Sequence, residues 1–192
     1  MTLEELYNIL LSDNPGNSIR NNEEEIFRLI PELKTCKGFN QNNEWHIYDV
    51  YEHILHVVDE VSPNITMRLA ALFHDIGKPL SYTEDENKVG HFFGHWDESI
   101  KIFNAFADKH TIDKDIRERI NDLIYYHDTN ISKMNDERLS ELKERLGTKG
   151  IIELFELKRA DLLAQNEKYH YILEDYKKQK ELILNKGGNT HE

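Results

Sequence analysis

The chain has 192 residues, which suits one ordinary globular domain with a buried core. Its formal net charge of −12 argues against a broad groove for a nucleic-acid backbone, where lysine and arginine must replace counterions. The single cysteine, Cys36, excludes an intrachain disulfide and favours a reducing compartment.

The N-terminal residues, Met1 to Glu5, carry neither the basic nor the apolar part of a secretion signal. No segment approaches the roughly 18 apolar residues that cross a bilayer. We therefore expect a cytoplasmic protein without a membrane partner. The acidic composition does not exclude a small anionic substrate, because bound metal ions would reverse the local field.

Apolar residues recur at helical spacing through almost the whole chain, and no strand pattern of useful length is present. The sequence predicts helices over residues 3–11, 23–30, 47–61, 66–76, 95–109, 113–127, 135–147, 149–165 and 167–185. The helix at 66–76 is apolar nearly all round, so we expect it at the centre. The last helix is charged and is expected to project in part, and the tail 187–192 is expected to be disordered.

Several residues predict where these helices begin and end. We expect Asn14-Pro15-Gly16 to end the first helix, Asn22 to cap the second and Pro31 to close it. Gly77 suits the position after the end of the central helix, and a charged loop is expected over 81–90.

The adjacent pair His74-Asp75 stands at the C-terminal end of the central helix. An imidazole and a carboxyl group are costly to bury there unless something binds them. A divalent ion such as Zn, Mn or Fe takes both groups as ligands, and the negative end of the helix dipole favours a cation. The alternative is a metal-free, hydrogen-bonded pair.

Four more side chains face inward on their predicted helices. His53 lies at the edge of an apolar face, whereas His56 points away with acidic neighbours. A lone inward histidine is usually a satisfied core residue, but the number of inward histidines here favours metal ligation. An inward carboxylate is costly without a partner, so ligation is favoured there too. The further predicted ligands are His53, His95, His127 and Asp161; the competing carboxylates Asp97 and Asp128 are expected to be exposed.

The order His53, His74-Asp75-Ile76-Gly77-Lys78 and Asp161 resembles the HD superfamily of metal-dependent phosphohydrolases. This resemblance implies an all-α, single-domain helical bundle of the HD type. It divides the chain into N-terminal helices at 1–35, an HD metal-binding domain at 36–165 and a C-terminal helix with a tail at 166–192.

A closer resemblance joins residues 41–53 and 90–95 to the HD region of bacterial tRNA nucleotidyltransferases. It covers roughly residues 5–165. The nucleotidyl-transfer head of that family, with its glycine-rich segment and paired aspartates, is absent from this sequence. We therefore expect a hydrolase region on its own, without addition of nucleotides to tRNA.

The resemblance also implies two divalent ions, drawn from Fe, Mn, Co, Ni or Zn. One would be held by His53, His74, Asp75 and Asp161, and the other by Asp75, His95 and His127. A metal-activated hydroxide would attack a phosphomonoester or phosphodiester, with nucleotides, including 2′,3′-cyclic forms, as expected substrates. Catalysis is assigned to Asp75, Lys78 and His91, and substrate binding to Lys78, His91, Arg159 and His46.

Two other functions fit the same ligands. Inositol oxygenase and certain phosphonate-cleaving enzymes hold two irons with this ligand set, and imidazole and carboxylate suit iron and manganese equally. A nucleotide-binding module with slow turnover would keep the same helical core. A homodimer is compatible with the sequence.

Overall fold

The computed structural model describes residues 1–185, and nearly all of its regular structure is helical. The elements are α1 (Leu3–Leu10), α2 (Pro15–Asn21), α3 (Glu23–Leu29), α4 (Pro31–Cys36), α5 (Val50–Glu60), α6 (Ile65–Phe73), α7 (Lys78–Ser81), β1 (Thr83–Glu84), β2 (Gly90–His91), α8 (His95–His110), α9 (Lys114–Tyr126), η1 (Ile131–Lys133), α10 (Asp136–Leu163), η2 (Glu167–Tyr169) and α11 (Ile172–Asn185). The predicted all-α fold is confirmed. Among these residues, no helix combines the length and apolar content needed to span a bilayer.

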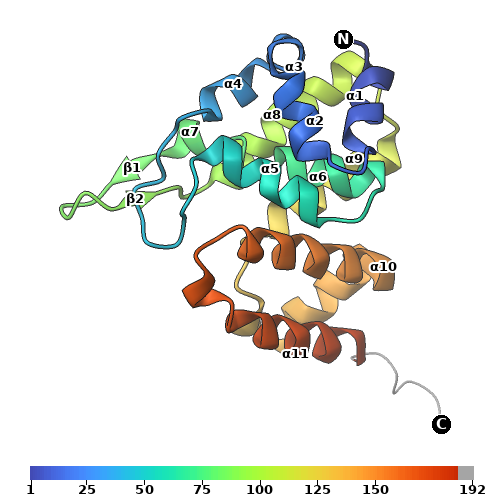
Figure 1. The fold of residues 1–192 in the computed structure, drawn as a ribbon. Coiled ribbons are helices and arrows are strands. Elements are labelled where there is room, and N and C mark those ends of the chain that lie inside the picture. The colour runs from blue at the N-terminus through green and yellow to red at the C-terminus, as the bar shows by residue number, and fades with distance from the viewer. Residues whose placement is uncertain (186–192) are drawn as a thin grey trace.

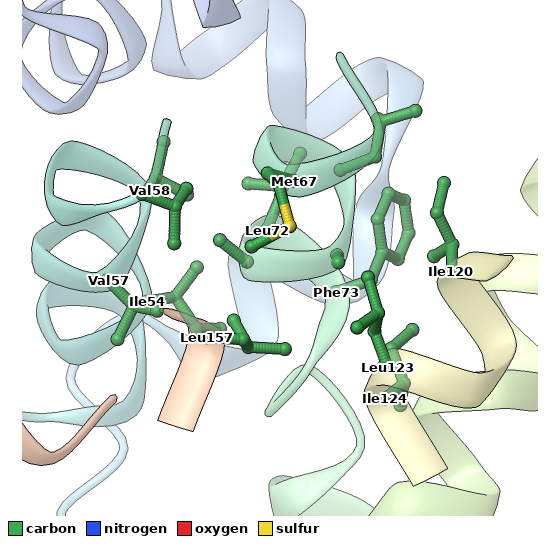
Figure 2. Close-up of a cluster of buried hydrophobic side chains, with 14 of the residues drawn as sticks. Ile54, Val57, Val58, Met67, Leu72, Phe73, Ile120, Leu123, Ile124 and Leu157 are labelled. Atoms are coloured by element: carbon green, nitrogen blue, oxygen red, sulfur yellow. The ribbon is translucent and has the colours of Figure 1, made fainter. Parts of the chain in front are cut away.

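The hydrophobic core lies where α5, α6, α9 and α10 meet. Figure 2 shows Ile54 of α5, Leu72 and Phe73 of α6, Leu123 of α9 and Leu157 of α10 around one apolar centre. Every residue of α6 from position 67 to its end is buried, which confirms its predicted central place. Figure 1 shows α1–α4 on one side of the α5–α6 pair and the α10–α11 hairpin on the other.

Two short helices, α2 and α4, differ from the prediction that Pro15 and Pro31 follow helix ends. Each proline instead occupies the first turn of a new helix, where its missing N–H removes no hydrogen bond. The Asn14 side chain accepts a hydrogen bond from the backbone N–H of Asn17 and so caps α2. The predicted cap of α3 is wrong, because the Asn22 amide donates to the carbonyl of Ser18 instead.

The helix predicted over 47–61 begins three residues later. Asp49 accepts from the backbone N–H of Glu52 and caps α5, while Ile47 lies before the helix and is 57% exposed. The loop predicted over 81–90 contains the hairpin β1–β2, in which Thr83 pairs with His91. The predicted break near position 147 is confirmed: Gly147 interrupts α10 with a φ of 64°.

The last helix does not project, which corrects the prediction. Figure 1 shows α11 lying along α10. Tyr176 packs edge-to-face on Phe155, and Ile183, seven residues further on, is fully buried. This spacing gives a helix with many charged residues one apolar stripe, which is enough to hold it against α10. The tail predicted to be disordered lies outside the described residues.

Gly77 is a point of close approach between backbones. It was predicted to lie directly after the end of the central helix, but α6 ends at Phe73 and Gly77 follows in a turn with an ordinary φ of −81°. A Cβ atom at this position would lie 2.5 Å from the carbonyl oxygen of His95 and 2.5 Å from the backbone nitrogen of Ser99. The absence of a side chain lets the turn after α6 touch the start of α8.

We expect Gly77→Ala to lower the free energy of unfolding by about 1–3 kcal/mol, the usual cost of forcing extra volume into a packed site. The added methyl group must push the first turn of α8 away from the end of α6. Urea denaturation followed by circular dichroism measures the effect. An unchanged midpoint would contradict the close contact described here.

Candidate metal centre

The structure brings together all six side chains that the sequence singled out as ligands. Their residues are all buried, with none more than 9% exposed. They come from α5 (His53), the end of α6 (His74 and Asp75), the start of α8 (His95), the end of α9 (His127) and α10 (Asp161). His56 lies outside the group and stacks on Tyr48, with ring centroids 4.2 Å apart. Asp97 and Asp128 are exposed, as expected.

One set of ligand atoms surrounds the Oδ2 side of Asp75. The Nε2 atom of His53 lies 2.9 Å from Oδ1 of Asp161 and 3.2 Å from Oδ2 of Asp75. The Nε2 atom of His74 lies 3.3 Å from the same Asp75 oxygen. Ligands bound to one ion at about 2.0–2.2 Å stand about 3.0–3.5 Å apart, so this spacing fits a shared ion.

A second set faces the other oxygen of Asp75. The Nε2 atoms of His95 and His127 lie 3.1 Å and 3.5 Å from Oδ1. The two nitrogens face each other at 3.3 Å, where two lone pairs repel unless a proton or a cation lies between them. The carboxylate of Asp75 is therefore the group that both sets share.

The other nitrogen of each histidine faces a backbone carbonyl. A carbonyl oxygen only accepts, so each Nδ1 carries hydrogen and donates, and Nε2 faces the centre. Three of the four carbonyls lie three residues earlier in the chain, so the local turn holds each ring. The Nδ1–O distances are 3.4 Å from His53 to Ala164, 2.7 Å from His74 to Ala71, 2.8 Å from His95 to Phe92 and 2.6 Å from His127 to Ile124.

The buried carboxylate of Asp75 has no hydrogen-bond partner of normal geometry. Both oxygens are buried and accept no hydrogen bond of normal geometry, although Nζ of Lys78 lies 2.6 Å from Oδ2. Burial opposes the charge, but His74 and Lys78 hold the pKa of Asp75 well below its usual range. A buried, ionised carboxylate of this kind is costly unless cations satisfy it. The donor set therefore fits divalent metal ions.

The two histidines at the helix ends differ in charge. Burial lowers the pKa of His74, but the carboxylates of Asp75 and Asp161 outweigh it and raise the pKa to about 10. Burial lowers the pKa of His127, which is therefore neutral near pH 7. With Nδ1 of His74 donating to a carbonyl, the extra proton sits on Nε2, the atom that would bind a metal.

Lys78 and His46 form a network beside the centre. The Lys78 ammonium donates to Oε1 of Gln41 at 2.8 Å and to Nε2 of His46 at 3.2 Å, and it contacts Asp75. Nδ1 of His46 lies 2.8 Å from Oδ1 of Asn43, and burial together with the Lys78 charge lowers the pKa of His46 to about 2. Both residues line the cavity that opens onto the centre, yet their N–H groups are engaged, so the substrate contacts predicted for them stay predictions.

A cavity of about 190 Å³ opens onto the centre between β2, α8 and α10. His91 lines it, with its ring stacked on Phe93 and its Nε2 3.2 Å from Oδ2 of Asp85. Arg159 is not part of this cavity. It lies on another face of α10, about 200° around the helix from Asp161, and its guanidinium stands 3.7 Å from Glu60.

Three residues that support the centre received no role from the sequence. Gln165 places its amide nitrogen 3.3 Å from both oxygens of Asp161, and Lys158 donates to the carbonyl of His127 at 2.6 Å. Both stand one helical turn from Asp161, so helical spacing could have found them. The role of Gln41 depends on the fold of its loop, which no spacing rule predicts.

Comparison with known proteins agrees with this geometry. Residues 45–166 match the HD domain family, and the match contains all six candidate ligands. Over 169 residues the chain is 30% identical to the CC-adding tRNA nucleotidyltransferase of Thermus thermophilus. The alignment covers 83% of this chain and 35% of that relative, so the chain spans about a third of the relative's length.

Proposed function

Because the chain belongs to the HD domain family, whose members are generally metal-dependent hydrolases, we propose that it is a phosphohydrolase acting on a small phosphoester. The observation that carries the proposal is the sharing of Asp75 between two ligand sets, one on each carboxylate oxygen. Two-metal phosphohydrolase sites need such a bridge to hold their ions about 3.5–4 Å apart.

Two divalent ions account for the arrangement. His53, His74, Asp75 and Asp161 would hold one ion, and Asp75, His95 and His127 would hold the other. Bound ions of this kind lower the pKa of water and polarise the phosphoryl oxygens. Fe, Mn, Co, Ni and Zn all accept imidazole and carboxylate, so the donor set does not select among them.

The protein's own residues orient and charge the site. The carbonyl partners of the four imidazoles fix the ring planes, so the ligand atoms point inward before anything binds. Lys78 keeps Asp75 ionised and adds positive charge beside the phosphate position. His91, which contacts Asp85 at the cavity wall, would donate a proton to the leaving oxygen.

A nucleotide is the favoured substrate class. The relative described above is a nucleotidyltransferase, and its name connects this type of sequence to nucleotide chemistry. The net charge of −12 and the small cavity favour a compact substrate over a long nucleic-acid backbone. A cytoplasmic location and a homodimer stay predictions.

We expect the purified protein to hydrolyse bis(p-nitrophenyl) phosphate and 2′,3′-cyclic nucleotides when Mn²⁺, Co²⁺ or Ni²⁺ is added. A chelator should stop the reaction, and fresh metal should restore it. His74→Ala should eliminate turnover, whereas His56→Ala, a histidine outside the centre, serves as the matched control. Undiminished hydrolysis by His74→Ala would overturn the proposal, and oxygen consumption with a candidate substrate would favour oxygenase chemistry.

A further inference from the structure

A second cavity, of about 530 Å³, adjoins the metal centre. It lies between η1, the end of α10 and α11. The two cavities share the walls formed by His46, Asp128, Asp161 and Gln165. Because Asp161 is also a proposed metal ligand, a group bound in the second cavity lies beside the reacting phosphate. The second cavity is in the size range of small-molecule sites, about 300–1,000 Å³.

The cavity is rich in hydrogen-bond acceptors. The carboxylates of Asp128 and Asp175 line it, and neither can donate when ionised. Oε1 of Gln179, also in the lining, is buried and has no hydrogen-bond partner. An unsatisfied buried acceptor is costly, so a ligand that brings N–H groups is favoured.

Aromatic rings stand at the edge of the same cavity. Trp45 is 41% exposed, and its ring stacks on that of Tyr169, with ring centroids 3.6 Å apart. Tyr171 is 68% exposed, a high value for a residue that lines a cavity. Exposed aromatic faces of this kind stack on planar ligands.

A lysine already faces one aromatic ring of this cavity, and the carboxylates disfavour further phosphates. Nζ of Lys158 already lies 5.0 Å from the Tyr176 ring centroid, where an ammonium ligand would otherwise bind. It donates to the carbonyls of His127 and Thr129, which leaves at most one of its three hydrogens for an anion. The Asp128 and Asp175 carboxylates repel a second phosphate. A planar ligand that is rich in N–H donors fits this lining.

We propose that this cavity is a base pocket, which binds the nucleobase of the substrate while its phosphate faces the metal centre. Carboxylate acceptors select bases that carry an exocyclic amino group, such as cytosine, over uracil, which presents an oxygen at that position. The inference rests on the proposed function and names its substrate class: nucleotides with an amino-bearing base.

Kinetics with matched substrates test the stacking face. 2′,3′-cyclic CMP is compared with glycerol 1,2-cyclic phosphate, which has the same cyclic diester but no base; ³¹P NMR follows both. Tyr171→Ala should raise KM for the nucleotide about fivefold or more and leave the base-free substrate unchanged, because one stacking partner is lost. Tyr125→Ala, an exposed tyrosine at a different cavity, is the control.

A comparison of cytosine and uracil substrates tests the role of the carboxylate acceptors in the cavity. The unaltered protein should favour 2′,3′-cyclic CMP over 2′,3′-cyclic UMP in kcat/KM. Asp175→Asn should reduce that ratio about fivefold or more, because the new amide can donate to uracil. Equal kcat/KM for the two nucleotides in the unaltered protein would overturn the inference.

Nucleoside binding separates the base pocket from hydrolysis. In a Trp96→Phe variant Trp45 is the remaining tryptophan, so cytidine, which has no phosphate, should quench its fluorescence. Tyr171→Ala should weaken that binding, and Tyr125→Ala should not. Cytidine binding without hydrolysis of any phosphoester would refute the proposed function alone. Hydrolysis of the base-free diester without cytidine binding would refute the base pocket alone.

Discussion

Asp75→Asn is expected to abolish hydrolysis and to strip both metal ions from the purified protein. Asp75 is the residue that the two ligand sets share, and each of its oxygens faces one set. Asparagine keeps the shape but loses the negative charge that offsets two cations and the nearby Lys78 ammonium. The rate should fall more than about 100-fold, beyond the roughly 10–100-fold that loss of a supporting group costs.

The matched control is Asp97→Asn, the same chemical change in an exposed carboxylate in the first turn of α8. It should keep the metal content and rate of the unaltered protein. Elemental analysis gives ions per chain, and circular dichroism verifies that each variant is folded. An Asp75→Asn protein that retained both ions would rule out the shared carboxylate.

Metal binding is expected to release about one proton per chain near pH 7.5 and to strengthen about tenfold per pH unit between about pH 6.5 and 10. The proton comes from His74, whose pKa in the metal-free protein is raised to about 10. The pKa values of Asp75 and Asp161 lie well below their usual range, so these ligands are already ionised and release nothing. Calorimetry in two buffers of different ionisation enthalpy counts the protons released.

The raised pKa of His74 also determines how the stability of the metal-free protein changes with pH. In the folded protein the pKa of His74 is raised to about 10 from its ordinary value of 6.5. Its protonation therefore stabilises the metal-free protein fully below about pH 6.5, and this contribution is lost as the pH rises towards 10. Metal should consequently raise the melting temperature more at pH 8.5 than at pH 6.5. A metal-induced shift that is equal at both pH values would contradict this assignment.

The sequence indicated which six side chains meet at this centre, because their placement is mostly local. His74 and His127 end helices, His95 begins one, and each ring is held by the carbonyl three residues before it. Helical periodicity alone therefore identifies inward histidines. Arg159 shows the limit of that approach, because nearness in sequence to Asp161 places it on a different face of α10.

Other features could not be predicted from the sequence, because the same residue type can have different structural roles. Pro15 and Pro31 can follow one helix or start another, and only the fold decides between these roles. Gly77 served close packing instead of an unusual backbone angle. The base pocket depends on α11 folding back along α10, which the charged sequence of α11 did not predict.

The carbonyl partner of His53 sets it apart from the other three histidines. It belongs to Ala164, 111 positions later, and Asp161 comes from the same stretch of chain. Detachment of the α10–α11 hairpin would therefore remove Asp161 and the carbonyl partner of His53 from the centre. His95 and His127 would keep their hydrogen bonds to the carbonyls of Phe92 and Ile124. If the two proposed ions bind, the one held by His53 and Asp161 would therefore depend on the packing of whole helices. The other would depend on the local turns at the ends of α6, α8 and α9.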